Sequence, residues 1–262
     1  MDESLSLNQY NILADKNTYG KWKDVNGEYF SDPKTIEALY RLFAESNVLL
    51  PHHIELVDFG SAEGLVGEYF KQELSKKHSV NLTLVDVVAE HLNANTDPET
   101  IKIHDDILTF SRENEYDLAI TRSLLHYFSK DDQVKVVRNI YHSLKRGGYF
   151  LLQAFIQNDS DLNLFLKLNN YVGKKLQLIP LEEVSAMLGA TGFVEITVLG
   201  DAPTWNCSSD NLKTRYDLSV QDLANMARLI SDAQETDKRG FSLNGNAFTV
   251  PVPFNVLIAR KV

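Results

Sequence analysis

Short runs of β-branched and aliphatic residues alternate with longer amphipathic stretches from about residue 55 to the end of the chain. This alternation is typical of βαβ units arranged around a parallel sheet. It predicts strands at Glu55–Phe59, Leu82–Val87, Thr100–Ile103, Asp117–Thr121, Tyr149–Ala154, Val194–Val198 and Asn255–Ala259. It predicts helices at Leu65–Lys76, Ala89–Ala94, Lys130–Leu144 and Leu181–Leu188, and an earlier helix that begins near Pro33. We therefore expect an α/β protein.

Three segments do not follow this alternation. Residues 1–32 are polar but rich in aromatics, Asp159–Gly173 follows the fifth strand, and residues 201–247 contain one amphipathic helix at Val220–Ala233. In open α/β sheets, ligands bind at the carboxyl ends of the strands, and additional segments often cover that edge. These segments are therefore expected either to form lids and pocket walls or to pack against the sheet. The expected division of the chain is an N-terminal helical lid (1–50), a ligand-binding core (51–200), an insertion (201–247) and the last strand (248–262).

A loop rich in small residues follows the first predicted strand, in the stretch LVDFGSAEGLVG that runs from Leu56 to Gly67. Loops of this kind bind phosphate groups, dinucleotides or S-adenosylmethionine. A Walker-type phosphate loop requires a lysine and a serine or threonine after its last glycine, whereas Leu65 and Val66 follow Gly64 in this chain. The sequence therefore excludes that type of phosphate site.

A dinucleotide site is harder to exclude. The A-x-G-x-x-G pattern that begins at Ala62 differs from GxGxxG at one position, and Asp86 ends the second predicted strand, where an acid can bind ribose hydroxyls. However, Asp58 before the loop and Glu63 within it would repel a pyrophosphate. S-adenosylmethionine has no phosphate and carries a sulfonium and an ammonium group, so these carboxylates favour it.

Four motifs in this order resemble those of the class I S-adenosylmethionine-dependent methyltransferase family. DFGSAEG is similar to the family's D-x-G-x-G-x-G, with Ala62 replacing the middle glycine, and LTLVD to its ribose-binding strand. HDD is similar to its G-D adenine motif, with Asp105 replacing glycine, and LKRGGYFLL to its L-K-P-G-G segment, with Arg146 replacing proline. The resemblance covers roughly residues 55–200. It implies a three-layer Rossmann-like sandwich whose seven-stranded, mostly parallel sheet has the order 3-2-1-4-5-7-6 and an antiparallel last strand.

The resemblance also implies a cofactor, S-adenosyl-L-methionine, with S-adenosyl-L-homocysteine as its product. Asp58 and the loop glycines would line the methionyl group, and Asp86 would bind the ribose hydroxyls. Asp106, with the backbone of Ile107, would hold the adenine. The complete implied set, in which Arg122 and Ser123 approach the cofactor from the other side, is Asp58, Gly60, Ser61, Ala62, Gly64, Asp86, Val87, Asp105, Asp106, Ile107, Arg122 and Ser123.

His126 is the candidate general base. Methyl transfer from a sulfonium requires mainly that the nucleophile be positioned and desolvated, and a base is needed only when the acceptor atom carries a proton. The segment LLHYFSKDDQ, which contains His126, is similar to the L-H-D-W-S-D segment of plant-type small-molecule O-methyltransferases, in which that histidine is the base. The chain lacks the N-terminal dimerisation domain of those enzymes, so their substrate class does not transfer. A structural histidine is the alternative interpretation.

Other side chains suggest less specific roles. The aromatics Tyr10, Tyr19, Trp22, Tyr29 and Phe30 are candidates for a substrate lid or a cation-binding cage, with simple packing as the alternative. His104 lies beside two acids, but metal-dependent methyltransferases of the catechol type place an aspartate after the fourth strand, where this chain has Thr121 and Arg122. We therefore expect no metal.

Composition limits the partners. Acidic residues outnumber basic ones 36 to 26, and the net charge of −10 makes a nucleic-acid partner unlikely. The chain has a single cysteine, no apolar run long enough to cross a membrane and an acidic, polar first segment, so we expect a cytoplasmic location. The oligomeric state stays open.

The expected function is methyl transfer from S-adenosylmethionine to an O, N, S or C nucleophile of a small molecule. A protein or RNA methyltransferase of the same fold is the main alternative. The N/D-P-P-Y tetrapeptide of amide and exocyclic-amine methylases is absent, because Thr121-Arg122-Ser123-Leu124 occupies its place. An NAD(P)-dependent oxidoreductase and a non-catalytic protein of the methyltransferase fold are more distant alternatives.

Overall fold

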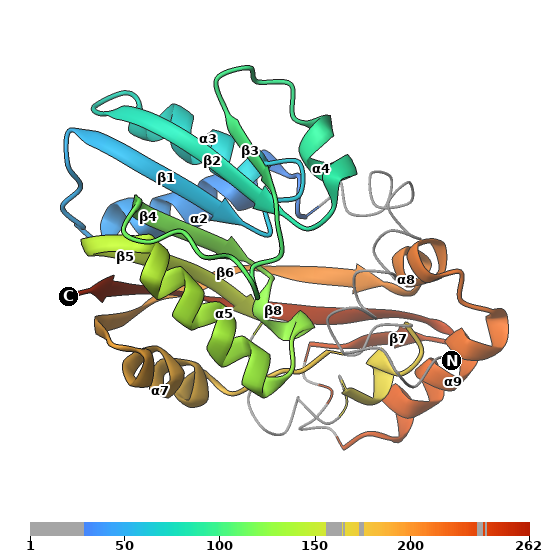
Figure 1. Cartoon of the computed structure of the whole chain (residues 1–262). Coiled ribbons are helices and arrows are strands. Elements are labelled where there is room, and N and C mark those ends of the chain that lie inside the picture. The colour runs from blue at the N-terminus through green and yellow to red at the C-terminus, as the bar shows by residue number, and fades with distance from the viewer. Residues whose placement is uncertain (1–28, 156–163, 165, 173–175, 235–237, 239) are drawn as a thin grey trace.

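A single twisted sheet runs through the molecule (Figure 1). The computed structural model describes residues 29–155, 164, 166–172, 176–234, 238 and 240–262. The strands are β1 (His53–Phe59), β2 (Ser79–Asp86), β3 (Ile101–His104), β4 (Tyr116–Arg122), β5 (Leu144–Phe155), β6 (Phe193–Ser208), β7 (Ser242–Asn244) and β8 (Ala247–Lys261). Their order is β3-β2-β1-β4-β5-β8-β6, and the short β7 pairs with β8. Only β7 was absent from the prediction.

The strand directions also agree with the predicted topology. Strands β3, β2, β1, β4 and β5 pair in parallel, whereas β8 is antiparallel to both β5 and β6. The expected Rossmann-like order with an antiparallel last strand is therefore confirmed.

Helices cover both faces of the sheet and create three layers (Figure 1). One face packs against α2 (Pro33–Glu45) and α3 (Leu65–Leu74), and the other against α5 (Lys130–Ser143) and α7 (Leu181–Thr191). The remaining helices are α4 (Ala89–Ala94), the short 3-10 helix η1 (Leu125–Tyr127), α8 (Ser209–Tyr216) and α9 (Val220–Asp232). None of the described helices combines the length and the apolar character needed to cross a membrane.

Local sequence explains where several helices begin. Asp32 caps α2 by accepting a hydrogen bond from the Lys34 backbone N–H, and Pro33 is the first helical residue. Ser129 caps α5 through the Asp132 backbone N–H. Helix α3 begins differently, because its cap is Gly64 in the left-handed region at φ 85°. That exception lies in the glycine loop.

Two strands extend well beyond their predicted ends. Strand β6 continues from the predicted Val198 to Ser208, and β8 begins at Ala247 instead of Asn255. Their pairing continues to Ser208 opposite Thr249 and is interrupted by register shifts, one of them between Ala202 and Trp205. Because such bulges accommodate glycine and proline within a strand, the strand continues through a stretch that the sequence pattern interprets as loop.

The segment predicted as a helical insertion, 201–247, therefore begins inside the sheet. Its first eight residues belong to β6, and only the remainder forms α8, α9 and β7. The buried residues Met226 and Ile230 of α9 pack in the same apolar cluster as Val250 and Val252 of β8. The strand extension and the two helices thus form one packed unit at the carboxyl edge of β5.

Candidate active site

The loop between β1 and α3 is packed tightly against its neighbours. The backbone N–H groups of Gly60 and Ser61 donate to the carbonyl of Val85, at 2.8 and 3.2 Å. Gly60 and Gly64 both have positive φ, 67° and 85°. A Cβ at Gly60 would lie 2.8 Å from a methyl carbon of Leu124, and one at Gly64 would lie 2.3 Å from a methyl carbon of Leu84. Both glycines are therefore required by backbone conformation and by packing.

Ala62, which stands where the family has a glycine, adopts a glycine-like conformation. Its φ is 48°, a region that costs a non-glycine residue roughly 1–2 kcal/mol. Its N–H donates to Oδ2 of Asp86 at 2.9 Å. The carboxylate of Asp86 thus links the end of β2 to the loop that follows β1.

Two further groups hold the Asp86 carboxylate. Its Oδ1 accepts from the Val88 backbone N–H at 2.8 Å, and Nδ1 of His91 on α4 lies 3.4 Å from the same oxygen. The side chain is buried. A carboxylate fixed at the carboxyl end of the second strand is suitably placed to accept hydrogen bonds from a ribose.

Asp58 is an acid buried in the core at the end of β1. Its Oδ2 accepts from the Gly67 backbone N–H at 3.0 Å. Burial raises the pKa of Asp58 to about 7, an effect that the Gly67 hydrogen bond and the distant charge of Arg122 only partly offset and that the negative charge of Asp86 reinforces. A cation bound at this edge would favour the ionised form, so the group fits the charge of a sulfonium or ammonium ligand.

The loop after β3 folds back on the end of β2. The Asp105 N–H donates to the carbonyl of Asp86 at 3.2 Å, and Oδ1 of Asp105 accepts from the Asp106 N–H at 2.8 Å. Oδ1 of Asp106 accepts from Leu108 N–H at 3.0 Å. The carbonyl of Ile107 accepts from Nδ2 of Asn139 at 2.7 Å. Asp105 and Asp106 therefore order a loop that lies beside Asp86.

His104 does not belong to a metal site in the described part of the chain. Its Nε2 lies 3.1 Å from the carbonyl of Val87, and no group of three or more potential metal-ligating side chains occurs among the described residues. This contact attaches β3 to the turn that follows β2.

Arg122 is directed toward the segment that precedes α2. Its Nη1 donates to the carbonyl of Phe30 at 2.8 Å and its Nε to Oε1 of Gln153 at 3.1 Å. The guanidinium carbon lies 5.4 Å from the ring centroid of Tyr29 and 5.2 Å from that of Phe30. Burial lowers the pKa of Arg122. The cofactor contact expected for this residue stays a prediction, and the contacts observed are with the protein itself.

Tyr29 packs into the core. Its hydroxyl donates to the carbonyl of Pro203 at 2.6 Å, and its ring stacks on Phe254 with the centroids 5.4 Å apart. Phe30 is half-buried and packs edge-on against Trp205, at 5.4 Å between centroids. The other three lid candidates, Tyr10, Tyr19 and Trp22, lie outside the described residues.

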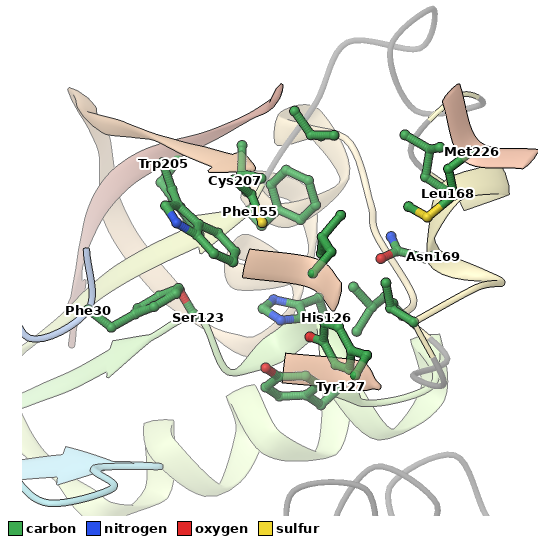
Figure 2. A pocket seen from close by; sticks show the side chains of 17 residues that line it. Phe30, Ser123, His126, Tyr127, Phe155, Leu168, Asn169, Trp205, Cys207 and Met226 are labelled. Carbon is green, nitrogen blue, oxygen red and sulfur yellow. The ribbon is translucent and has the colours of Figure 1, made fainter. Parts of the chain in front are cut away.

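A pocket opens beside this edge, between the ends of β4 and β5 and the extended parts of β6 and β8 (Figure 2). Its empty volume is about 750 Å³ with the open mouth included. Figure 2 shows Phe30 and Trp205 on one side, Leu168, Asn169 and Met226 on the other, and His126 between them. The described lining residues are Phe30, Ser123, His126, Tyr127, Phe155, Leu168, Asn169, Val172, Leu176, Trp205, Cys207, Leu212, Tyr216, Met226, Val250, Val252 and Phe254.

Three predicted residues line this pocket: the lid candidate Phe30, Ser123 and His126. His126 lies in η1 and is mostly buried, with its ring 4.2 Å from that of Tyr127 and edge-on to Phe155 at 6.2 Å. Ser123 directly follows β4 in a left-handed conformation, φ 56°, and its N–H donates to the carbonyl of Gln153. The Oγ of Ser123 is buried and has no hydrogen-bond partner among the described residues. Such a group requires a partner when the site is filled.

Sequence reasoning missed most of the pocket wall. Trp205 and Cys207 of β6 and Val250, Val252 and Phe254 of β8 line it, although the pattern indicated loop at the first pair and placed the last strand only from Asn255. The alternation of Val250, Val252 and Phe254 was the available signal, because every second residue of a strand faces the same side. Asn169 carried no signal that sequence alone could supply.

The comparisons identify the fold as that of methyltransferases. The Bacillus subtilis YcgJ protein has a TM-score of 0.69 at 16% identity, and the match covers 86% of this chain and 98% of that one. A Haemonchus contortus phosphoethanolamine N-methyltransferase 2, solved with phosphomonomethylethanolamine and S-adenosylhomocysteine, has a TM-score of 0.61 at 16% identity, covering 100% of this chain and 61% of that one. The Burkholderia thailandensis 1,6-didemethyltoxoflavin-N1-methyltransferase, solved with 1,6-didemethyltoxoflavin and S-adenosylhomocysteine, has a TM-score of 0.56 at 14% identity, covering 100% and 93%.

The sequence itself matches a family model. Residues 28–198 match the model described as a methyltransferase domain, and a search of curated protein sequences finds no match. The chain therefore belongs to the methyltransferase domain family. The resemblance to class I S-adenosylmethionine-dependent methyltransferases is confirmed in family and in fold.

Proposed function

We propose that this protein transfers a methyl group from S-adenosylmethionine to a small molecule that binds in the pocket beside His126. The observation that carries the proposal is the contact between Gly60 and Leu124. Any Cβ at Gly60 in the cofactor loop would meet the side chain of Leu124, and Leu124 directly follows Ser123, which lines the pocket. The loop and the pocket are thus in direct contact across the end of β4.

The charges of the loop support this cofactor. When bound, S-adenosylmethionine supplies an activated methyl group on a sulfonium sulfur. Asp58 offers a carboxylate to the methionyl end, and its pKa of about 7 means that a neighbouring cation readily ionises it. Asp86, fixed by Ala62 and Val88, accepts from the ribose hydroxyls. Asp106 and the Ile107 backbone bind the adenine from the adjacent loop.

The pocket would position the acceptor and keep water away from it. Aromatic and aliphatic side chains form most of its described lining, so they exclude water from the nucleophile and hold it near the carboxyl end of β4. If the acceptor atom carries a proton, the His126 imidazole takes that proton as the new bond to carbon forms. The solved relatives were crystallised with different acceptors, so the fold alone does not select one.

Calorimetry with S-adenosylhomocysteine tests the cofactor. We expect micromolar binding, no measurable binding of NAD(H) or NADP(H), and a loss of at least tenfold in affinity for Asp86→Ala. Asp210→Ala, on the exposed part of α8, is the matched control and leaves the affinity unchanged. Binding of a nicotinamide dinucleotide in preference to S-adenosylhomocysteine would overturn the proposal.

A screen for release of S-adenosylhomocysteine in the presence of candidate acceptors tests the reaction. We expect turnover with a small molecule and none with a bulk protein or RNA substrate. Turnover only on RNA or on a folded protein would contradict the small-molecule assignment while leaving the cofactor assignment intact.

A further inference from the structure

The described lining of the pocket has no lysine, arginine, aspartate or glutamate side chain, and His126 is the basic group in it. The other polar members of that lining are neutral hydrogen-bonding groups such as Ser123, Asn169 and the Trp205 indole. An ammonium group placed among them would lose its water shell without gaining a partner of opposite charge, and a phosphate or carboxylate could gain one only from a protonated His126. The described walls therefore favour an uncharged molecule.

Two aromatics beside the pocket, Tyr29 and Phe30, already face a cation of the protein. The guanidinium of Arg122 lies over the rings of Tyr29 and Phe30, at 5.4 and 5.2 Å, and it donates to both of their backbone carbonyls. These two rings thus make cation–π contacts with a side chain of the protein itself. A cationic acceptor near Phe30 would also be repelled by Arg122.

The walls are suited to a flat ring system. Phe30 and Trp205 meet at 67° between ring planes, and Phe155 meets His126 edge-on at 89°. Phe254 lies 5.9 Å from Phe155 and 6.1 Å from Phe30. Rings inclined in this way present both edges and faces to a guest, which is the arrangement that aromatic pairs prefer.

Asn169 provides an unmet hydrogen-bond donor in addition to the Ser123 hydroxyl. It lies in the helical segment 166–169, and Figure 2 shows its amide group directed toward the interior of the pocket. Its Nδ2 is buried and has no hydrogen-bond partner among the described residues. An amide nitrogen can only donate, so the group that satisfies it must be an acceptor such as a carbonyl oxygen or a ring nitrogen.

We propose that the methyl acceptor is an uncharged aromatic molecule that carries a hydrogen-bond acceptor, and that Asn169 recognises that acceptor while the ring packs between Phe30, Trp205 and Phe155. The inference rests on the proposed function, because it assumes that the pocket holds the methyl acceptor. Asn169 is then a specificity residue, since a ligand without the acceptor would leave its amide buried and unpaired.

Three aromatic probes distinguish the effects of the ring, the hydrogen-bond acceptor and the charge on affinity. Each is titrated into protein saturated with S-adenosylhomocysteine. Coumarin is a neutral bicycle with a carbonyl, naphthalene has the same ring size without one, and naphthoate adds a negative charge. Phosphomonomethylethanolamine serves as a charged molecule without a ring. Affinities are measured by ligand-observed NMR titration. We expect coumarin to bind more tightly than naphthalene, and neither charged probe to bind detectably.

Asn169→Leu tests the amide with little change in volume. We expect it to lower the affinity for coumarin by about tenfold, which corresponds to the loss of a hydrogen bond to a buried donor. We expect the affinity for naphthalene to stay equal or to increase. Asn170→Leu, at the exposed neighbouring position, is the matched control and leaves both affinities unchanged. The affinity of each variant for S-adenosylhomocysteine is measured first, because an unchanged affinity shows that the variant is folded. Only variants with that unchanged affinity are compared.

The outcomes distinguish the two proposals. Failure of the wild-type protein to bind S-adenosylhomocysteine would overturn the proposed function. Normal binding of S-adenosylhomocysteine together with tighter binding of a charged probe, with no binding of either neutral ring, or with equal weakening of coumarin and naphthalene in Asn169→Leu would overturn the inference about the acceptor alone.

Discussion

The guanidinium of Arg122, at the end of β4, donates a hydrogen bond to the backbone carbonyl of Phe30, 92 residues earlier in the chain, over 2.8 Å. The same guanidinium reaches Gln153 of β5. One side chain therefore joins the segment before α2 to the two central strands that end at the active-site edge. Phe30 owes its position in the pocket wall to this link.

Removing the link is expected to destabilise the fold. Arg122→Met should lower the free energy of unfolding by about 2 kcal/mol, because the hydrogen bonds of a buried charged donor to the Phe30 carbonyl and the Gln153 side chain are lost. The measurement is urea denaturation followed by circular dichroism. Arg138→Met, on the exposed face of α5, is the control. An equal loss in the two variants would show that the Arg122 contacts contribute nothing specific.

The raised pKa of Asp58 predicts that its contribution to the free energy of unfolding decreases as the pH rises. Its carboxyl has a pKa of about 7 in the folded protein against 3.8 for an ordinary aspartate, so between these values the folded state binds more protons than the unfolded state. Asp58 then lowers the free energy of unfolding by up to about 1.4 kcal/mol per pH unit, and the loss is complete above its folded pKa.

Asp58→Asn isolates that contribution. From about pH 4 to about pH 7, wild type should lose stability while Asp58→Asn should not, so the free energy of unfolding of the variant should rise relative to that of wild type. The difference should then stay constant. The same variant should bind S-adenosylhomocysteine more weakly at alkaline pH, because it lacks the carboxylate that we propose faces the methionyl end of the cofactor. A difference that does not change with pH would contradict the buried, protonated state.

Two glycines with positive φ allow a matched comparison. A Cβ at Gly64 would lie 2.3 Å from Leu84, whereas one at Gly245 has no neighbour within 4 Å. Both substitutions to alanine carry the conformational cost of roughly 1–2 kcal/mol, but only Gly64→Ala adds a steric clash in the core. We expect the melting temperature to fall clearly further for Gly64→Ala than for Gly245→Ala. We expect the affinity for S-adenosylhomocysteine to fall only in Gly64→Ala. Equal melting temperatures would refute the close approach.

His126 predicts a selective loss of turnover. With an acceptor that carries a proton, His126→Asn should reduce kcat by about 10²- to 10⁴-fold and leave the affinity for S-adenosylhomocysteine unchanged. His142→Asn, exposed on α5, is the control. Turnover of His126→Asn at the wild-type rate, with its wild-type pH profile, would leave the histidine a packing role against Tyr127 and Phe155.

The cofactor edge could be predicted because its signals are local. Asp58 and Asp86 lie at the ends of strands whose apolar residues are contiguous in sequence, and Gly64 lies in the loop after β1, so the sequence indicates both the strands and where they end. The left-handed conformation of Ala62 was not part of the prediction, which only noted that Ala62 replaces a glycine. The strand order, which follows from the alternation and the resemblance, is confirmed.

The pocket could not be predicted because it depends on distant pairing. Strand β6 continues past Gly200 and Pro203 only because β8 lies alongside it, with Trp205 opposite Val252. Neither segment has a strong strand pattern on its own. The partners of Arg122 are likewise set by tertiary contacts, since nothing in the local sequence indicates that its guanidinium will meet Phe30 instead of a ligand.

The extended β6–β8 ladder has a consequence for how this protein could acquire new substrates. Trp205 and Cys207, and Val250, Val252 and Phe254, lie two residues apart on one face of paired strands, so their side chains enter the pocket while the hydrogen-bonded backbone stays fixed. Exchanging these five side chains would reshape the cavity while strand β1, which contains Asp58, and the loop that follows it stay in place. The scaffold thus separates the part that supplies the methyl group from the part that evolution or an engineer can vary freely.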